Sequence, residues 1–233
     1  MNLDMAGATH AGNIRDHNED AFGVDEALPA AVLADGMGGL SHGEVASETV
    51  VTRVMEGLRN GDSASAALRA AHEEILRVSV GAAQRMGSTA VIVTRSEGRL
   101  TIHWVGDSRA YLLRGGELRL LTRDHSLVQG LIDAGAITET EAESHPNRNV
   151  VTRAVGIQDG EQLEIDHVDL DARSGDRLMI CSDGLHGFLP HARIAALLQE
   201  HDDNQKAASA LVEATLQETE AGDNVSVICV TVA

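Results

Sequence analysis

The stretch TAVIVTRSEGRLTIHWV, residues 89–105, contains two apolar runs joined by Ser96-Glu97-Gly98. Both runs are rich in β-branched residues, and a short connection that contains glycine is typical of a β-hairpin. A second connection of this kind, Gly115-Gly116, separates RAYLLR from ELRLL. Because such tight turns join antiparallel neighbours, both stretches predict antiparallel sheet.

Short strands and paired helices alternate over the rest of the chain. Apolar runs bounded by turn residues predict strands at 21–25, 30–34, 89–95, 100–105, 109–114, 117–121, 163–169, 177–181 and 225–232. Apolar residues at three- and four-residue spacing predict helix pairs at 44–58 with 63–83 and at 192–199 with 205–219. Shorter helices are expected at 126–134 and 138–144, the second from a capping box formed by Thr138 and Glu141. This alternation indicates an α+β layered sandwich in a single domain, residues 1–233.

The composition excludes several classes of protein. The chain has 233 residues, 43% of them hydrophobic, so it is long enough to bury a sizeable core. Its net charge of −18 argues against nucleic acid or an anionic membrane as the main partner, because both attract clustered Lys and Arg. The sequence has no apolar run of membrane-spanning length, and its first residues, MNLDMAGATH, lack the basic and apolar regions that are typical of a signal peptide. We therefore expect a cytoplasmic protein, and we expect it to be a monomer. Cys181 and Cys229 lie in apolar runs, which predicts buried thiols.

Aspartates recur where apolar runs end. Asp35-Gly36 closes AAVLAD and Asp183-Gly184 closes RLMICSD, while Asp20, Asp107 and Asp223 end or adjoin other apolar stretches. Carboxylates suit a hard cation such as Mg²⁺ or Mn²⁺, and the glycine permits a sharp turn that brings a backbone carbonyl close to the ion. Each motif alone has a plainer interpretation, since Asp-Gly is a common turn. Their combination predicts a metalloenzyme.

One arginine stands beside the first acidic pair. In RDHNED, residues 15–20, Arg15 precedes Glu19 and Asp20 by four and five residues. A guanidinium can donate two parallel hydrogen bonds to two phosphate oxygens, whereas an ammonium cannot. Arg15 is therefore a candidate for binding a phosphate group. The sequence shows no Cys-x5-Arg motif or Ser-His-Asp spacing that would suggest a covalent nucleophile.

The order of these motifs and the residues in them resemble those of the metal-dependent serine/threonine protein phosphatases of type 2C, in their compact bacterial form. The likeness runs from Ala8 to Val232 and includes MGSTA at 86–90, TRDHS at 122–126 and SHPNR at 144–148. It implies a central β-sandwich of two antiparallel sheets flanked by helix pairs, in four αββα layers, with a metal site at one edge. It also implies hydrolysis of phosphoserine and phosphothreonine on proteins by a water that bridges two Mn²⁺ or Mg²⁺ ions.

The resemblance assigns roles around the two core ions. Asp35 would bridge both ions, and the Gly36 carbonyl would bind one of them. Asp183 and Asp223 would complete the ligands of the other ion.

Residues outside this core receive roles from the same resemblance. Glu19 and Asp20 would hold metal-bound waters, and Arg15 would bind the substrate phosphate. Asp107, together with Asp183, would bind a third, weaker metal.

Two positions depart from the family pattern. Met37 stands where some members carry a histidine suited to protonating the leaving alkoxide. The general acid stays open between a metal-bound water and one of the histidines His17, His42 and His145. Asn149 stands where a small hydroxyl residue is expected, and its amide oxygen would neighbour the third metal.

The implied partners are phosphorylated proteins, in particular a bacterial Ser/Thr kinase and its substrates. The segment 124–154 matches the family's flap over the site. Two other classes of protein stay open. A catalytically weak phosphoprotein-binding regulator would keep the fold, although it is expected to lose a metal aspartate and none is lost here. A metal-dependent nuclease or phosphodiesterase would need a basic groove, which the net charge of −18 disfavours.

Overall fold

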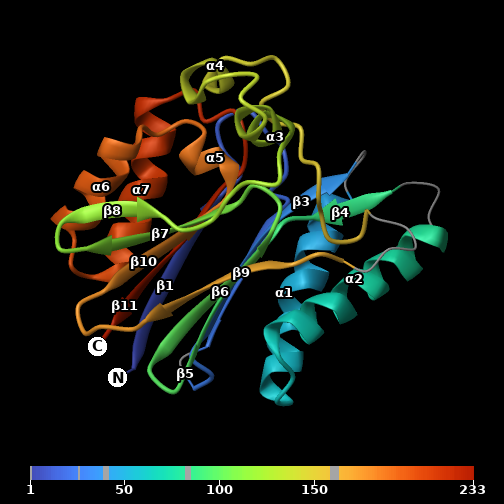
Figure 1. Cartoon of the computed structure of the whole chain (residues 1–233), viewed down its shortest axis with the longest axis horizontal. Helices are drawn as coiled ribbons and strands as arrows, with labels where there is room; N and C mark the ends of the chain where they lie inside the picture. Colours follow the sequence, from blue (N-terminus) through green and yellow to red (C-terminus); the bar gives the residue numbers. More distant parts are fainter. Residues whose placement is uncertain (1, 26, 39–41, 82–84, 158–162) are drawn as a thin grey trace.

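Two antiparallel sheets lie at the centre of the computed structural model, with helices on both outer sides (Figure 1). The structure describes residues 2–25, 27–38, 42–81, 85–157 and 163–233. The four layers follow the order helix, sheet, sheet, helix, so the predicted α+β sandwich is confirmed.

The first sheet has the strand order β1-β11-β10-β7-β8. These strands are β1 (Leu3–His10), β11 (Val225–Val232), β10 (Arg177–Cys181), β7 (Arg109–Arg114) and β8 (Glu117–Leu120). The two ends of the chain meet in this sheet, because β1 pairs with β11 along its whole length. Gly115 and Gly116 join β7 to β8 with φ of 61° and 84°, a conformation that favours glycine.

The second sheet has the order β2-β3-β5-β6-β9, and the short β4 pairs with the end of β3. Its strands are β2 (Asp20–Asp25), β3 (Ala30–Gly38), β4 (Met86–Ser88), β5 (Ala90–Ser96), β6 (Arg99–Val105) and β9 (Asp166–Asp171). The predicted hairpin at 89–105 forms β5 and β6. Ser96 lies opposite Arg99, which leaves Glu97 and Gly98 as a two-residue turn with positive φ at both positions.

Helices cover the outer face of each sheet. α1 (Gly43–Arg59) and α2 (Ala64–Gly81) cover the second sheet, whereas α6 (His191–Glu200) and α7 (Asn204–Glu218) cover the first. Three shorter helices gather at one end of the sandwich in Figure 1: α3 (Leu127–Asp133), α4 (Glu139–Glu143) and α5 (Asp183–His186). The capping box of Thr138 and Glu141 starts α4 as predicted.

The alternation of side chains along the central strands builds three apolar layers. In β3, Ala31 and Leu33 face the space between the sheets, while Val32 and Ala34 face α1 and α2. Strand β11 divides its side chains in the same way, between the inter-sheet layer and the layer under α6 and α7. Strands buried on both faces carry apolar residues at nearly every position, which is what these runs show.

Several elements differ from the prediction. β1, β4 and α5 were not expected: β1 contains Gly7 and few β-branched residues, and β4 and α5 are too short to show a period. The strand predicted at 163–169 begins at Asp166 instead, because Leu163 is buried in the layer between the second sheet and its helices. Residues 82–83 of the predicted helix 63–83, and Gly39 of the first Asp-Gly motif, lie outside the described residues.

Two other predictions concern the core and the membrane. Cys181 and Cys229 are buried and free, as predicted. Within the described part of the chain, no helix combines the length and apolar character that crossing a membrane requires.

Candidate active site

Carboxylates from several strand ends converge at one edge of the sandwich. Asp35 lies near the end of β3 and directly opposite Asp20, which starts β2. Asp183 follows the end of β10, and Asp223 precedes the start of β11, the antiparallel neighbour of β10. Asp107 follows the end of β6. Where one antiparallel strand ends its neighbour begins, so each sheet brings its acids to the edge that lies beside α5 (Figure 1).

The charges of these acids act on one another. Burial raises the pKa of Asp35 well above its ordinary value, and the charges of Asp20, Asp183, Asp107 and Asp223 raise it further. Burial is also the main reason why the pKa values of Asp20 and Asp107 rise to about 7 and that of Asp183 rises to about 6. Carboxyls in this situation either keep their protons or take up a cation.

Main-chain and hydroxyl contacts hold Asp35 in place. Its N–H donates to Thr89 Oγ1 at 3.0 Å, and its carbonyl accepts from the Thr89 N–H at 2.8 Å and from Ser88 Oγ at 3.0 Å. The MGSTA stretch therefore serves as a clamp on the central aspartate. Thr89 Oγ1 also lies 2.7 Å from Ser108 Oγ, which connects the clamp to the residue after Asp107.

Asp20 carries an oxygen that has no partner. Its Oδ2 accepts a hydrogen bond from Ser182 Oγ at 2.8 Å. Its Oδ1 is buried, and no group in the described part of the chain donates to it. An orphaned buried carboxylate oxygen is costly unless an ion or a bound water meets it. The residues around Asp20 are therefore suited to a cation or to the waters bound to one.

Glu19 lies at the N-terminal end of α1. A Cβ at Gly43 would stand 2.6 Å from the Glu19 carboxyl carbon, so a larger residue there would displace this carboxylate. Burial raises the pKa of Glu19, while the Gly43 N–H acts in the opposite direction. A helix N-terminus favours negative charge.

Gly36 lets two backbones approach closely. A Cβ on Gly36 would lie 2.1 Å from the Gly43 carbonyl oxygen, and the Gly36 N–H donates to the Glu19 carbonyl at 3.1 Å. The glycine after Asp35 thus seats the start of α1 against β3. Gly184 has the same role at the second motif, where its Cβ would lie 1.9 Å from the Asn224 carbonyl oxygen.

Arg15 reaches the acidic group from the loop between β1 and β2. Its Nη2 donates to Asp223 Oδ2 at 2.9 Å, and its side chain is 56% exposed. Asn224 fixes this loop, since its Nδ2 donates to the carbonyls of Ala11 and His17 and its Oδ1 accepts the Glu19 N–H at 2.8 Å. The RDHNED and Asp223-Asn224 motifs therefore form one unit.

The remaining predicted residues lie farther out. His17 is exposed on the loop that carries Arg15, and His42 precedes α1. His145 accepts the Asn147 N–H within the segment 124–154, and Asn149 is exposed in that segment. Met37 pairs with Gly87 in the β3–β4 ladder.

Sequence reasoning missed residues that position the acids rather than bind at the site. His186 is one example, because its Nε2 donates to the Asp107 carbonyl at 3.0 Å. Ser182 is another, and it stands inside the CSDG motif directly before Asp183. The CSDG motif is visible in the sequence, but it does not indicate which distant group the Ser182 hydroxyl contacts.

The acids do not close a metal cage by themselves. Among the described residues, no three His, Cys, Asp or Glu side chains are grouped closely enough to hold an ion on their own. Mg²⁺ is usually held by one or two carboxylates and keeps several waters. A cation at this edge would therefore complete its coordination with waters and with a backbone carbonyl such as that of Gly36.

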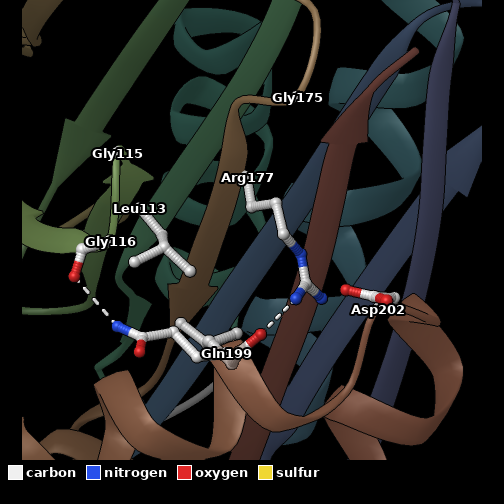
Figure 2. A pocket seen from close by; sticks show the side chains of 8 residues that line it. Leu113, Gly115, Gly116, Gly175, Arg177, Gln199 and Asp202 are labelled. Atoms are coloured by element: carbon white, nitrogen blue, oxygen red, sulfur yellow. Dashed lines mark hydrogen bonds between the residues drawn. The ribbon is translucent and has the colours of Figure 1, made fainter.

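A pocket of about 200 Å³ lies away from the acids, at the opposite end of β10 (Figure 2). Arg177 lines it, but this guanidinium already donates to the carbonyls of Leu198 and His201, near the C-terminal end of α6. Gln199 is directed at the Gly116 carbonyl, 2.9 Å away. These contacts join α6 to the β7–β8 hairpin, so the pocket is a gap where structural elements of the fold pack together.

Comparison with known proteins identifies the family. The family model described as protein phosphatase 2C matches residues 6–221. The serine/threonine phosphatase stp of Listeria monocytogenes is 35% identical over 206 residues, which covers 82% of this chain and 81% of that protein. The serine/threonine protein phosphatase PstP of Mycobacterium tuberculosis is 37% identical over 242 residues, or 97% of this chain and 44% of that protein.

Solved structures agree with the sequence relatives. The crystal structure of M. tuberculosis PstP superimposes with a TM-score of 0.91 at 34% identity, covering 100% of this chain and 99% of that one. A structure of the PstP catalytic domain with two manganese ions gives a TM-score of 0.88 at 33% identity, covering 99% and 98%. The expected class of enzyme, a metal-dependent protein-serine/threonine phosphatase, is confirmed by this agreement. The chain belongs to the protein phosphatase 2C family.

Proposed function

We propose that the acidic edge of the sandwich is the catalytic centre of this phosphatase and that it works with Mn²⁺ or Mg²⁺. The observation that carries the proposal is the group of aspartates with raised pKa values, among which Asp20 has a buried oxygen that finds no partner in the described part of the chain. Two ions in the core site would be held by Asp35, the Gly36 carbonyl, Asp183 and Asp223. Glu19 and Asp20 would hold waters of these ions, and Asp107 would serve a third, weaker ion with Asn149 as its neighbour.

The proposed ions and the side chains of the protein would have different roles in the reaction. Bound ions would supply a water that is deprotonated near neutral pH and would neutralise charge on the phosphate. Arg15 binds the phosphate: one of its N–H groups is held by Asp223, and its exposed guanidinium leaves further donors for a phosphate oxygen. The contacts of Asn224 with the Arg15 loop fix the distance between this donor and the acids.

The substrates of the enzyme are phosphorylated proteins. We further propose that it opposes a bacterial Ser/Thr kinase in the cytoplasm, that it acts as a monomer, and that residues 1–233 form one catalytic domain with a flap at 124–154. The flap begins beside the centre, because Asp124 binds Arg109 through a bidentate ion pair with contacts of 2.7–3.1 Å. Position beside a rigid site suits a segment that selects substrates.

The variant Asp35→Asn should abolish phosphatase activity and leave the fold intact. In the metal-free wild type, the free energy of unfolding should fall as pH rises from about 4 to about 7. The reason is that carboxyls whose pKa is raised by folding stabilise the protein only while protonated. Asp35→Asn removes one repelling charge, so its free energy of unfolding should fall less as pH rises. Its melting temperature in EDTA should equal or exceed that of the wild type.

Mn²⁺ should raise the melting temperature of the wild type more than that of Asp35→Asn, because only a formed site links ion binding to folding. Thermal unfolding followed by circular dichroism, with and without Mn²⁺, measures both effects. Glu48→Gln on the exposed face of α1 is the matched control and should behave as the wild type. Equal stabilisation of wild type and Asp35→Asn by Mn²⁺ would contradict the assignment.

Replacing Arg15 by Ala should weaken use of the substrate and spare the metals. Loss of a charge-assisted hydrogen bond costs about 1.5–3 kcal/mol, which is roughly a 10- to 150-fold lower kcat/KM on a phosphothreonine peptide. Arg15→Lys should recover only part of this loss, since a point charge cannot fork. Arg99 is equally exposed at 57% and also pairs with an aspartate, so Arg99→Ala is the control. Wild-type kcat/KM in Arg15→Ala would show that Arg15 is an ordinary surface arginine.

The variant Asp107→Ala should keep the two-metal core and lose turnover. The proposal places Asp107 only at the third ion, so a calorimetric titration with Mn²⁺ should lose its weakest phase and keep the tighter ones. If every phase disappeared, Asp107 would belong to the core site or to the fold.

Neutralising the acidic face of α4 should change selectivity and leave the chemistry intact. Glu139, Glu141 and Glu143 are all exposed on this flap helix, and exposed charges attract basic substrates in a salt-sensitive way. The triple Gln variant should have a lower kcat/KM for a basic phosphopeptide at low salt and an unchanged value for a small aryl phosphate. Gln at 141 preserves the capping box, so α4 should survive. An equal fall for both substrates would make the flap part of the catalytic scaffold.

A further inference from the structure

His125 connects the flap to the strand end that carries Asp107. The imidazole is only 9% exposed, although it stands at the start of the flap. The backbone N–H of Gly106 donates to His125 Nδ1 at 3.0 Å, and the backbone N–H of His125 donates to the Gly106 carbonyl at 2.9 Å. The residue before Asp107 is thus bound to His125 through both of its backbone groups.

The Nε2 side of the imidazole faces an ion pair. Nε2 is 3.3 Å from Asp166 Oδ2, at the start of β9. Arg153 Nη1 is 3.1 Å from Nε2 and also 3.1 Å from Asp166 Oδ1, so this guanidinium joins the imidazole to the carboxylate. Burial, followed by the charge of Arg153, lowers the pKa of His125, which keeps the ring neutral.

Both arms of the flap meet at this histidine. His125 itself belongs to the outgoing arm, next to Ser126, which pairs with Val151. In the returning arm, the Thr152 N–H donates to the His125 carbonyl at 2.8 Å, and Arg153 follows directly. Trp104 stacks on the imidazole at a centroid distance of 6.3 Å and fixes the plane of the ring.

Gly106 lies between the flap and the acidic edge of the sandwich. Its φ of 105° suits only glycine, and a Cβ there would stand 2.6 Å from Thr89 Cγ2. Thr89 is the residue that clamps Asp35. Gly106 therefore lies between His125 on the flap side and the Asp35 clamp on the other, with Asp107 as the next residue.

We propose that His125 is a positioning residue that sets the backbone at Gly106, and with it Asp107, according to the position of the flap. Its Nδ1 acts on the Asp107 side and its Nε2 acts on the Arg153–Asp166 side. The inference rests on the proposed role of Asp107 in turnover. It makes the flap a determinant of turnover through Asp107, in addition to its role in choosing substrates.

Two amide variants separate the two sides of the ring. His125→Asn places an acceptor near the position of Nδ1 and does not reach Asp166. His125→Gln places a donor near the position of Nε2 and has no acceptor for Gly106. His103→Gln is the matched control, because His103 is a partly buried histidine in β6 that stacks on His167 and does not contact Gly106. Melting temperatures establish that each variant is folded.

Hydrogen exchange of the Gly106 amide in the metal-free protein is the first readout. Exchange should become about 2- to 10-fold faster in His125→Gln, as expected for loss of one hydrogen bond, and should stay near the wild-type rate in His125→Asn and His103→Gln. Unchanged exchange in His125→Gln would overturn the proposed contact in solution.

Turnover of a phosphothreonine peptide in a double-mutant cycle is the second readout. His125→Gln should lower kcat in the wild-type background and have no further effect in Asp107→Ala, because both changes act on one unit. An equal fold-loss in both backgrounds would show that His125 acts independently of Asp107 and would overturn the inference. If Asp107→Ala alone kept full turnover, the proposed role of Asp107 would fail, and the exchange rates would still report whether His125 holds Gly106.

Discussion

Repulsion among clustered carboxylates is the constraint on which the rest of this structure depends. Five aspartates stand at one edge of the sandwich, and burial together with neighbouring negative charge raises the pKa of Asp20, Asp35, Asp107 and Asp183. A fold that only maximised stability would not gather these groups, because each charge lowers the stability conferred by its neighbours. Strands that are fixed elsewhere in the core hold these acids together, and the cations that we propose for the site would reduce their repulsion.

The supporting contacts show how the edge is imposed. Ser88 and Thr89 hold the backbone of Asp35, Ser182 donates to Asp20, and Asn224 joins the loop of Arg15 to the start of β11. None of these groups is charged, so they orient the acids without neutralising them. On our proposal, the negative potential at the edge would attract a divalent ion, and the positions of the oxygens would be set before the ion arrives.

The sequence predicts well what is local and periodic. The hairpin of β5 and β6, the two helix pairs and the aspartates at strand ends all follow from runs of neighbouring residues. β1 could not be predicted in this way, because its small and polar residues form a strand only through pairing with β11, more than two hundred positions away. The partners of Ser182 and His186 are also out of reach, since a hydroxyl or an imidazole can contact many groups and the tertiary fold selects one.

On our proposals, the flap selects substrates, the acidic edge carries the chemistry, and His125 connects the two. Asp35 stands in β3, which pairs with β2 and β4 on either side of it, and Asp183 follows the end of β10. Asp107 differs from them, because it follows Gly106, and Gly106 is bonded to the flap histidine His125 rather than to a neighbouring strand. On our proposal, a substrate that changed the position of the flap would act on Asp107 through this backbone connection. Asp107 is the acid that we assign to the weakest ion, so a change in its position would alter turnover without dismantling the core.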